Sequence, residues 1–186
     1  MEKRGFGKIF IIIFSVILIL ILIVAMFLYS ALKVPDYDEK NKIILQNPIK
    51  GLTLEQAKIS FNESFVEYLL YSIGANNLHN PPLSDNKPKI KIVIENDIYA
   101  SIIEKGRVIV KKEDISDQDM TLKTNKEEAI KMMEDKNYIK QSFSSGKSEL
   151  SLLADKATLF AKGYLNIYKE LKGESITGGV IKIYTE

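Results

Sequence analysis

The chain lacks cysteine altogether, which excludes a disulfide framework, a zinc–thiolate site and a thiol nucleophile. Tryptophan is absent too, and the only histidine, His79, stands in a proline-containing loop that would support a catalytic triad poorly. Residues 146–148 read Gly-Lys-Ser, but the glycine that a phosphate-binding loop requires five residues before Gly146 is Gln141 here. We therefore predict no catalytic residue, no metal site and no cofactor, and we expect that the chain is not an enzyme.

Most of the chain also lacks an excess of charge of either sign. The 26 lysines and arginines against 24 aspartates and glutamates give a formal net charge of +2. Residues 1–30 hold three of the basic residues and one acidic residue, so the rest of the chain carries 23 of each. This neutrality predicts that the domain does not bind nucleic acid, because such binding needs a basic surface.

What the chain does have is one long apolar run. Residues 9–28, IFIIIFSVILILILIVAMFL, are uncharged and interrupted only by Ser15. At about 1.5 Å per residue, a helix of this length spans the roughly 30 Å hydrocarbon core of a membrane. The alternative is a cleavable signal peptide, whose apolar region has about 7–15 residues and ends in a small-x-small site. Cleavage after Ala31 would place Tyr29 at the third position back, so we favour an uncleaved transmembrane helix over residues 9–29.

The flanking charges predict which way this helix crosses the membrane. Lys3, Arg4 and Lys8 lie in the short tail of residues 1–8, directly beside the apolar run. The basic residues on the other flank are mixed with acidic ones. Because basic flanks tend to stay in the cytoplasm, we expect a single-pass membrane protein with a cytoplasmic N-terminus and an extracytoplasmic C-terminal domain.

Residues 30–52 are expected to be a linker, since Pro35, Pro48 and Gly51 stand among clustered charges. Residues 53–186 predict one soluble domain. Helices are indicated by hydrophobic spacing and by capping patterns at Thr53 and Thr124, whereas strands are indicated by alternation of period two. The helices expected are 53–73, 125–134, 137–144 and 156–171, and the strands expected are around 90–94, 99–104, 107–110, 120–123, 149–153 and 180–184.

The order of these elements is helix, antiparallel strands, helices, strand, helix and strand. Runs of strands flanked by helices are typical of an α+β fold, in which helices cover one face of a mostly antiparallel sheet. We therefore predict an α+β domain of this kind behind the single transmembrane helix.

A family resemblance rests on the second half of the chain. Residues 119–122 read Asp-Met-Thr-Leu, and an acidic helix start at 125–128, an amphipathic stretch at 138–143 and Ser-Gly-Lys at 145–147 follow. A strand at 149–153 then leads through Ala154-Asp155, where the family often has Gly-Asp, into the last helix. Together with the strands from residue 89, this order resembles the sterol carrier protein type 2 (SCP2) family over residues 89–171. The resemblance implies an α+β fold that encloses an apolar, lipid-binding tunnel and has no catalytic residues.

The candidate lipid-binding residues are apolar side chains on elements expected to face one side of the sheet: Met132, Met133, Phe143, Leu150, Leu152, Phe160 and Tyr164. Such a set lines a cavity for an acyl chain or sterol in one interpretation and forms an ordinary filled core in the other. Our first hypothesis is therefore a membrane-anchored lipid-binding or lipid-handling domain. The alternative is a non-catalytic interaction or structural module of the cell envelope with a filled core, in which loop 74–88 and the linker contact a protein partner.

Overall fold

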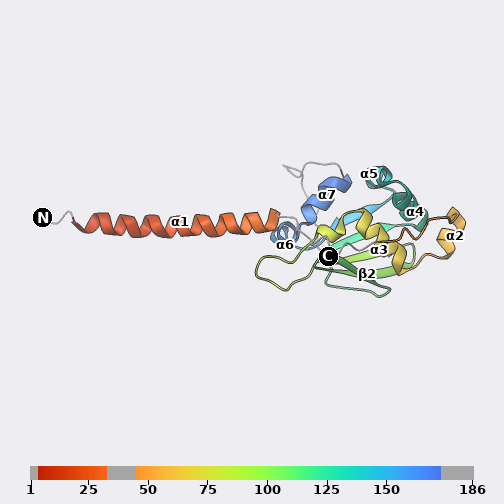
Figure 1. Ribbon diagram of the computed structural model, residues 1–186, viewed down its shortest axis with the longest axis horizontal. Coiled ribbons are helices and arrows are strands. Elements are labelled where there is room, and N and C mark those ends of the chain that lie inside the picture. Colours follow the sequence, from red (N-terminus) through yellow and green to blue (C-terminus); the bar gives the residue numbers. More distant parts are fainter. Residues whose placement is uncertain (1–3, 33–44, 173–186) are drawn as a thin grey trace. The chain divides into compact units, whose positions relative to one another are not determined.

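The computed structural model describes residues 4–32 and 45–172, and the chain divides into two compact units, residues 1–33 and 34–186. The first unit contains helix α1 (Arg4–Leu32), whose exposed span Ile11–Tyr29 has a mean hydropathy of 3.5 (Figure 1). By length and composition this helix is able to cross a membrane or to act as a signal anchor. The strand expected at residues 180–184 lies outside the described residues.

The second unit is built on a five-stranded sheet in the order β3-β2-β1-β4-β5. β1 and β4 run parallel, and the other neighbouring pairs are antiparallel. The predicted α+β fold with a mostly antiparallel sheet is therefore confirmed. The strands are β1 (Lys89–Ile94), β2 (Asp97–Glu104), β3 (Arg107–Lys111), β4 (Met120–Thr124) and β5 (Glu149–Leu152).

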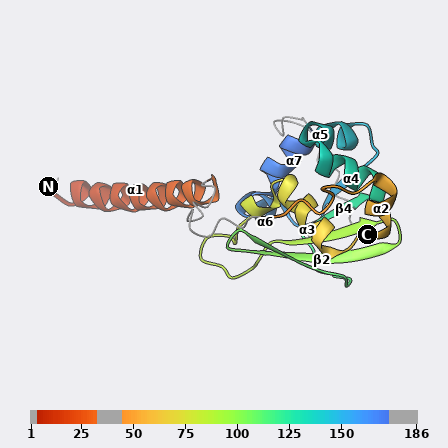
Figure 2. The same ribbon diagram turned by 45° about the vertical axis from the view of Figure 1, so that its right-hand side comes forward.

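Helices cover one face of this sheet (Figure 2). Every second residue of β1 faces these helices. Ile90, Ile92 and Ile94 are fully buried, as the alternating pattern predicted. The helices are α2 (Leu54–Ile59), α3 (Glu63–Ser72), the 3₁₀-helix η2 (Ala75–Asn77), α4 (Lys126–Glu134), α5 (Lys136–Ser144), α6 (Lys156–Ala161) and α7 (Tyr164–Lys172).

The helix expected over residues 53–73 is in fact two helices. Its start is confirmed, because Thr53 and Gln56 form the reciprocal capping box. The first helix, α2, ends at Ile59. The side chain of Asn62 then accepts the N–H of Ser64 and caps the second helix, α3. Ser60 is the C-cap of α2 and Asn62 is the N-cap of α3, a break that the continuous hydrophobic spacing did not reveal.

Two further expectations about the helices were wrong, one at the start of α4 and one within the last expected helix. The cap of α4 is Asn125, whose side chain accepts the N–H of Glu128, whereas the Thr124 hydroxyl bonds Ser148. The helix expected over residues 156–171 is broken by Gly163, whose φ of +86° lies in the left-handed region. α6 buries Leu159 and leaves Phe160 half-buried, whereas Tyr164 of α7 is fully buried.

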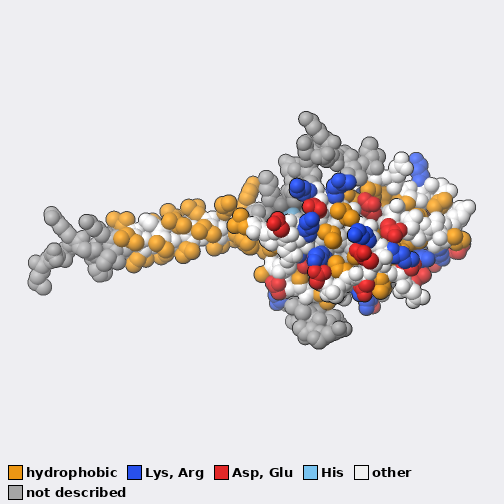
Figure 3. Space-filling model, turned by 90° about the horizontal axis from the view of Figure 1, so that it is seen from below, with side chains coloured by type: hydrophobic (Ala, Val, Ile, Leu, Met, Phe, Trp, Pro, Cys, Tyr) orange, Lys and Arg blue, Asp and Glu red, His pale blue; other side chains and the backbone are white. Residues whose placement is uncertain are grey.

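The opposite face of the sheet bears no helix among the described residues. The loop after β3 crosses it and forms ion pairs with β1, Asp114 with Lys91 and Asp117 with Lys89. These salt bridges hold the pKa of both aspartates below the usual value. Figure 3 shows basic and acidic side chains interleaved there, as the neutral charge balance of the domain leads one to expect.

Candidate functional site

The side chains predicted to bind lipid come together beneath the helices as part of one packed core. Six of the seven are buried: Met132, Met133, Phe143, Leu150, Leu152 and Tyr164. Phe160 is the exception, since Leu159 takes the buried position of α6. None of the seven lines the surface groove described next, so their role in lipid binding stays a prediction.

A groove with a volume of about 300 Å³ lies where the end of α3, the start of α5 and the end of α7 meet. Figures 1 and 2 both show α5 and α7 side by side above the sheet. This volume is at the lower end of the range for small-molecule sites. The residues that line the groove are Tyr71, Ser72, Ile73, Gly74, Asn76, Asn77, Lys136, Ile139, Lys140, Glu170 and Leu171.

The floor of the groove is apolar and continuous with the core. Ile73, Ile139 and Leu171 line the groove, and all three belong to the same buried cluster as Met132 and Phe143. A hydrocarbon group in the groove would therefore rest on the outer surface of that cluster. Each buried methylene would contribute about 0.8 kcal/mol of transfer free energy.

Local sequence signals place the walls of the groove. Gly74 ends the α3 segment with a φ of +81°, a conformation that glycine adopts without strain. On the other wall, Asp135 caps α5 by accepting the N–H of Asn137. Helical spacing then puts Lys136, Ile139 and Lys140 on one side of α5.

Charged groups stand at the rim. Lys136 and Lys140 of α5 and Glu170 of α7 are exposed. Within residues 45–172, no ion pair or hydrogen bond joins any of these three side chains to another described residue. The groove thus combines an apolar floor with charged side chains at its rim.

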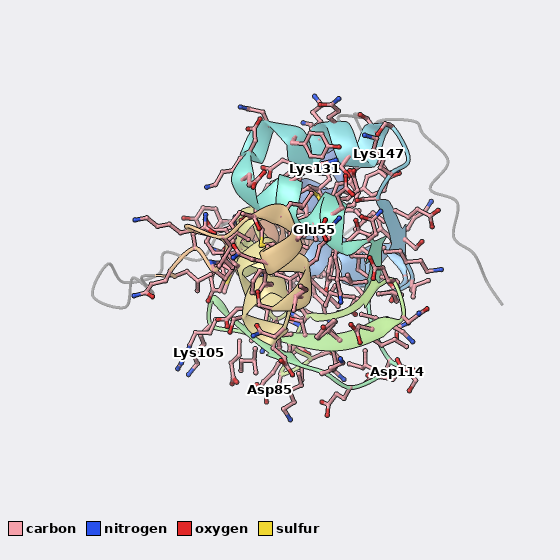
Figure 4. The ribbon with its side chains drawn as sticks, turned by 90° about the vertical axis from the view of Figure 1, so that its right-hand side faces the viewer. Glu55, Asp85, Lys105, Asp114, Lys131 and Lys147 are labelled. Atoms are coloured by element: carbon pink, nitrogen blue, oxygen red, sulfur yellow. The ribbon has the colours of Figure 1, made fainter. Side chains whose placement is uncertain are left out.

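A buried carboxylate, Glu128, attaches α5 to α4. It accepts hydrogen bonds from the hydroxyls of Tyr138 and Ser142, both at 2.9 Å. Lys131 and Lys147 lie 3.7 and 3.9 Å from it and balance its charge, and Figure 4 shows both lysines on the helical layer of the domain. Lys147 also donates to the Tyr138 hydroxyl, which with the nearby carboxylate raises the pKa of the lysine.

A second polar network is buried deeper, at the start of β4. Lys162, which is 1% exposed, lies 2.9 Å from both carboxylate oxygens of Asp119. The lysine also donates to the Lys87 carbonyl, and the Lys89 N–H donates to Asp119. The Tyr164 hydroxyl donates to the same carboxylate at 3.0 Å, and burial beside that negative charge raises its pKa well above the usual value.

This second network was not foreseen from the sequence. Tyr164 was assigned to an apolar lining, but its hydroxyl is held by Asp119. Lys162 is the C-cap of α6, and nothing in the local sequence marks this lysine as buried. The network satisfies its own hydrogen bonds and ties α6 and α7 to the sheet, which is a structural role.

No protein-family model and no curated protein matches the chain. Among solved structures, it is similar to UbiJ-SCP2, a ubiquinone synthesis protein, at 13% identity, covering 60% of this chain and 88% of that one with a TM-score of 0.34. It is also similar to sterol carrier protein 2 like 2 from Aedes aegypti at 20% identity, covering 53% and 92% with a TM-score of 0.32.

Both of these structures are SCP2 domains. They belong to the family that residues 89–171 resemble. A third similar structure is the inverting sec-alkylsulfatase Pisa1 from a Pseudomonas species, at 15% identity and a TM-score of 0.33, of which only 18% is covered. With all three TM-scores below 0.5, what this chain does has to be argued from its own residues.

Proposed function

We propose that this chain is a membrane-anchored lipid-binding protein, with the groove between α3, α5 and α7 as its binding site. The observation that carries the proposal is the chemistry of that groove. Its floor of Ile73, Ile139 and Leu171 suits a hydrocarbon chain, and its rim of charged side chains suits a polar headgroup.

The groove also suggests how a longer acyl chain would be accommodated. Ile139 of α5 belongs both to the floor and to the core cluster that contains Met133 and Phe143. The helix α5 packs on α4 and α7 and is attached through the polar contacts of Glu128. A small outward displacement of α5 would extend the groove towards the predicted lipid-binding residues.

Helix α1 would keep this site close to its ligand. In the proposal it crosses the membrane, with the N-terminus in the cytoplasm and the domain outside, on the basis of the basic N-terminal tail. Tethering raises the effective concentration of a site near the surface that holds its ligand. Protease added to intact cells should then cut the domain, and a domain cut only after lysis would reverse the orientation.

The proposal is tested by filling the groove. Asn77 is exposed and lines it, so Asn77→Trp would occupy the space without disturbing the core. Asn137→Trp is the matched control, because Asn137 is also an exposed asparagine, on α5, but does not line the groove. The full chain in maltoside detergent, mixed with a total membrane lipid extract, is examined by native mass spectrometry.

Adducts carried by α1 should be the same on all three proteins. Beyond these we expect further lipid adducts on the wild type and on Asn137→Trp, and a loss of about tenfold in the abundance of these further adducts on Asn77→Trp. The same further adducts on both variants would place the lipid elsewhere. An absence of further adducts on the wild type would overturn lipid binding by the domain.

The second candidate, an interaction or structural module with a filled core, is favoured by one observation. Six of the seven predicted lipid-binding residues are tightly buried against one another. Met133→Trp separates the two functions, because overpacking a full core costs about 1–3 kcal/mol of unfolding free energy. A variant that keeps its stability but loses lipid would indicate that ligands reach the core, and a destabilised variant would indicate that they do not.

A further inference from the structure

The two walls of the groove carry opposite charges. On the α5 wall, Lys136 and Lys140 stand one helical turn apart and point a pair of ammonium groups along the same side. On the other side, Glu170 of α7 lies next to Gly74, with its carboxylate 4.0 Å from the point where a Cβ would stand. Among residues 45–172, no ion pair joins these charges to another side chain.

The helix ends at the groove have the same polarity as the side chains. Ser72, Ile73 and Gly74 line it at the carbonyl end of the ten-residue helix α3, which carries the negative end of the helix dipole. Lys136 lines it at the amino end of α5, which is the positive end. Asp135 caps α5 from outside the lining of the groove and offsets part of this positive end, so the positive charge of the α5 wall comes mainly from Lys136 and Lys140.

We propose that the groove selects a zwitterionic phospholipid headgroup that bears a primary ammonium, as in a phosphatidylethanolamine. The inference rests on the proposed function and adds the class of ligand to it. The phosphate lies against Lys136 and Lys140, and the ammonium lies against Glu170 and the carbonyl end of α3.

A primary ammonium fits this wall better than the other common headgroup substituents. Glu170 and the backbone carbonyls are hydrogen-bond acceptors, and an ammonium provides three donors for them. A glycerol headgroup has no positive charge to offer the carboxylate. The acyl chain belongs on the apolar floor, so the headgroup without its chain has little reason to stay bound.

The test uses the full chain in maltoside detergent and four probes, read by native mass spectrometry in competition. Three probes share one acyl chain: lysophosphatidylethanolamine, lysophosphatidylglycerol and monoacylglycerol. The fourth is glycerophosphoethanolamine, which has the headgroup alone. The variants are Lys136→Glu with Lys140→Glu, Glu170→Gln, and a control of equal charge change, Lys105→Glu with Lys156→Glu. Both control lysines are exposed and do not line the groove, and Figure 4 shows Lys105 at the sheet, away from the helical layer.

We expect lysophosphatidylethanolamine to bind best. Its affinity should fall about fivefold when Glu170 is neutralised, as for other exposed ion pairs, and by more when the charges of both lysines are reversed. The double lysine variant should weaken both phospholipids. Glu170→Gln should weaken only the ethanolamine lipid, and the control should weaken neither.

Equal binding of the two phospholipids, or a Glu170→Gln variant that binds as the wild type does, would overturn the headgroup assignment while lipid binding stands. Binding of the chainless headgroup as tight as that of the lipid would overturn it as well. If the wild-type protein binds none of the four probes, both the headgroup assignment and lipid binding by the groove are overturned.

Discussion

Lys162 is the charged side chain most completely enclosed in the described domain. At 1% exposure, it is neutralised by Asp119 and also bonded to Asn86 and the Lys87 carbonyl. Removing one partner of a buried pair leaves the other charge uncompensated, so Lys162→Met should lower the free energy of unfolding by about 3–5 kcal/mol.

Urea unfolding of the full chain in detergent, followed by far-ultraviolet circular dichroism, measures this loss. A second substitution, Asp119→Asn, should restore part of it, since it removes the stranded charge. If the free energy of unfolding of Lys162→Met lies within about 1 kcal/mol of the wild-type value, the Lys162–Asp119 pair contributes little to stability.

Tyr164 predicts a dependence of stability on alkaline pH. Burial and Asp119 raise its pKa in the folded state above that of the unfolded chain. Its contribution is therefore fully present below the unfolded pKa of about 10 and is lost as pH rises beyond it, because only the unfolded form ionises. Tyr164→Phe should be about 1 kcal/mol less stable at pH 8 through the lost hydrogen bond.

The difference in unfolding free energy between the wild type and Tyr164→Phe should then be smaller at pH 11 than at pH 8. Urea unfolding curves at the two pH values measure it. A difference that stays constant would mean that the hydroxyl ionises as readily in the folded protein as in the unfolded chain, and one that widens would mean that it ionises more readily in the folded protein.

The burial of a residue could be predicted from the sequence only where a local pattern indicated it. The alternation of period two over residues 90–94 indicated a strand with one buried face, and the structure buries Ile90, Ile92 and Ile94. The contacts of Lys162 with Asp119 join residues 43 positions apart, and no local pattern indicates such a pair. The groove was missed for the same reason, since its walls come from three separate helices.

At the scale of elements, α5 is the movable wall in the proposed function. Its attachment depends on Glu128, which receives the hydroxyls of Tyr138 and Ser142. Glu128→Ala should therefore loosen α5 selectively. Hydrogen exchange in residues 136–144 should become about tenfold faster, while β1 and β4 keep their protection.

Glu127→Ala is the control, because Glu127 is at the surface and pairs with Lys58 and Lys131 rather than with α5. Unchanged exchange in α5 of the Glu128 variant would show that apolar packing alone holds this helix. Faster exchange throughout the sheet would show that Glu128 supports the whole domain.

The positions of most elements followed from periodicity, but the breaks within helices did not. Strands β1 to β5 fall within a few residues of the expected ranges, since alternation is a strong signal where one face is buried. The breaks at residues 60–62 and at Gly163 preserve enough apolar spacing to pass for continuous helices. A capping asparagine and a left-handed glycine were the signals that marked them.

At the scale of the whole chain, an exposed apolar helix and a neutral α+β domain are joined in one polypeptide. The proposed function requires the domain, and not only α1, to contact lipid. Helix α1 and the groove lie in different parts of the sequence. A reagent that marks the residues in contact with lipid therefore distinguishes lipid at α1 from lipid in the groove.

The most direct measurement uses the full chain in liposomes that contain a phospholipid with a photoreactive diazirine in its acyl chain. After illumination, peptide mass spectrometry locates the crosslinks. We predict crosslinks in α1 and also in the groove floor, at Ile73, Ile139 and Leu171, with the latter lost in Asn77→Trp and kept in Asn137→Trp. Crosslinks confined to Ile11–Tyr29 would contradict lipid binding by the domain and leave α1 as the only part of the chain that meets lipid.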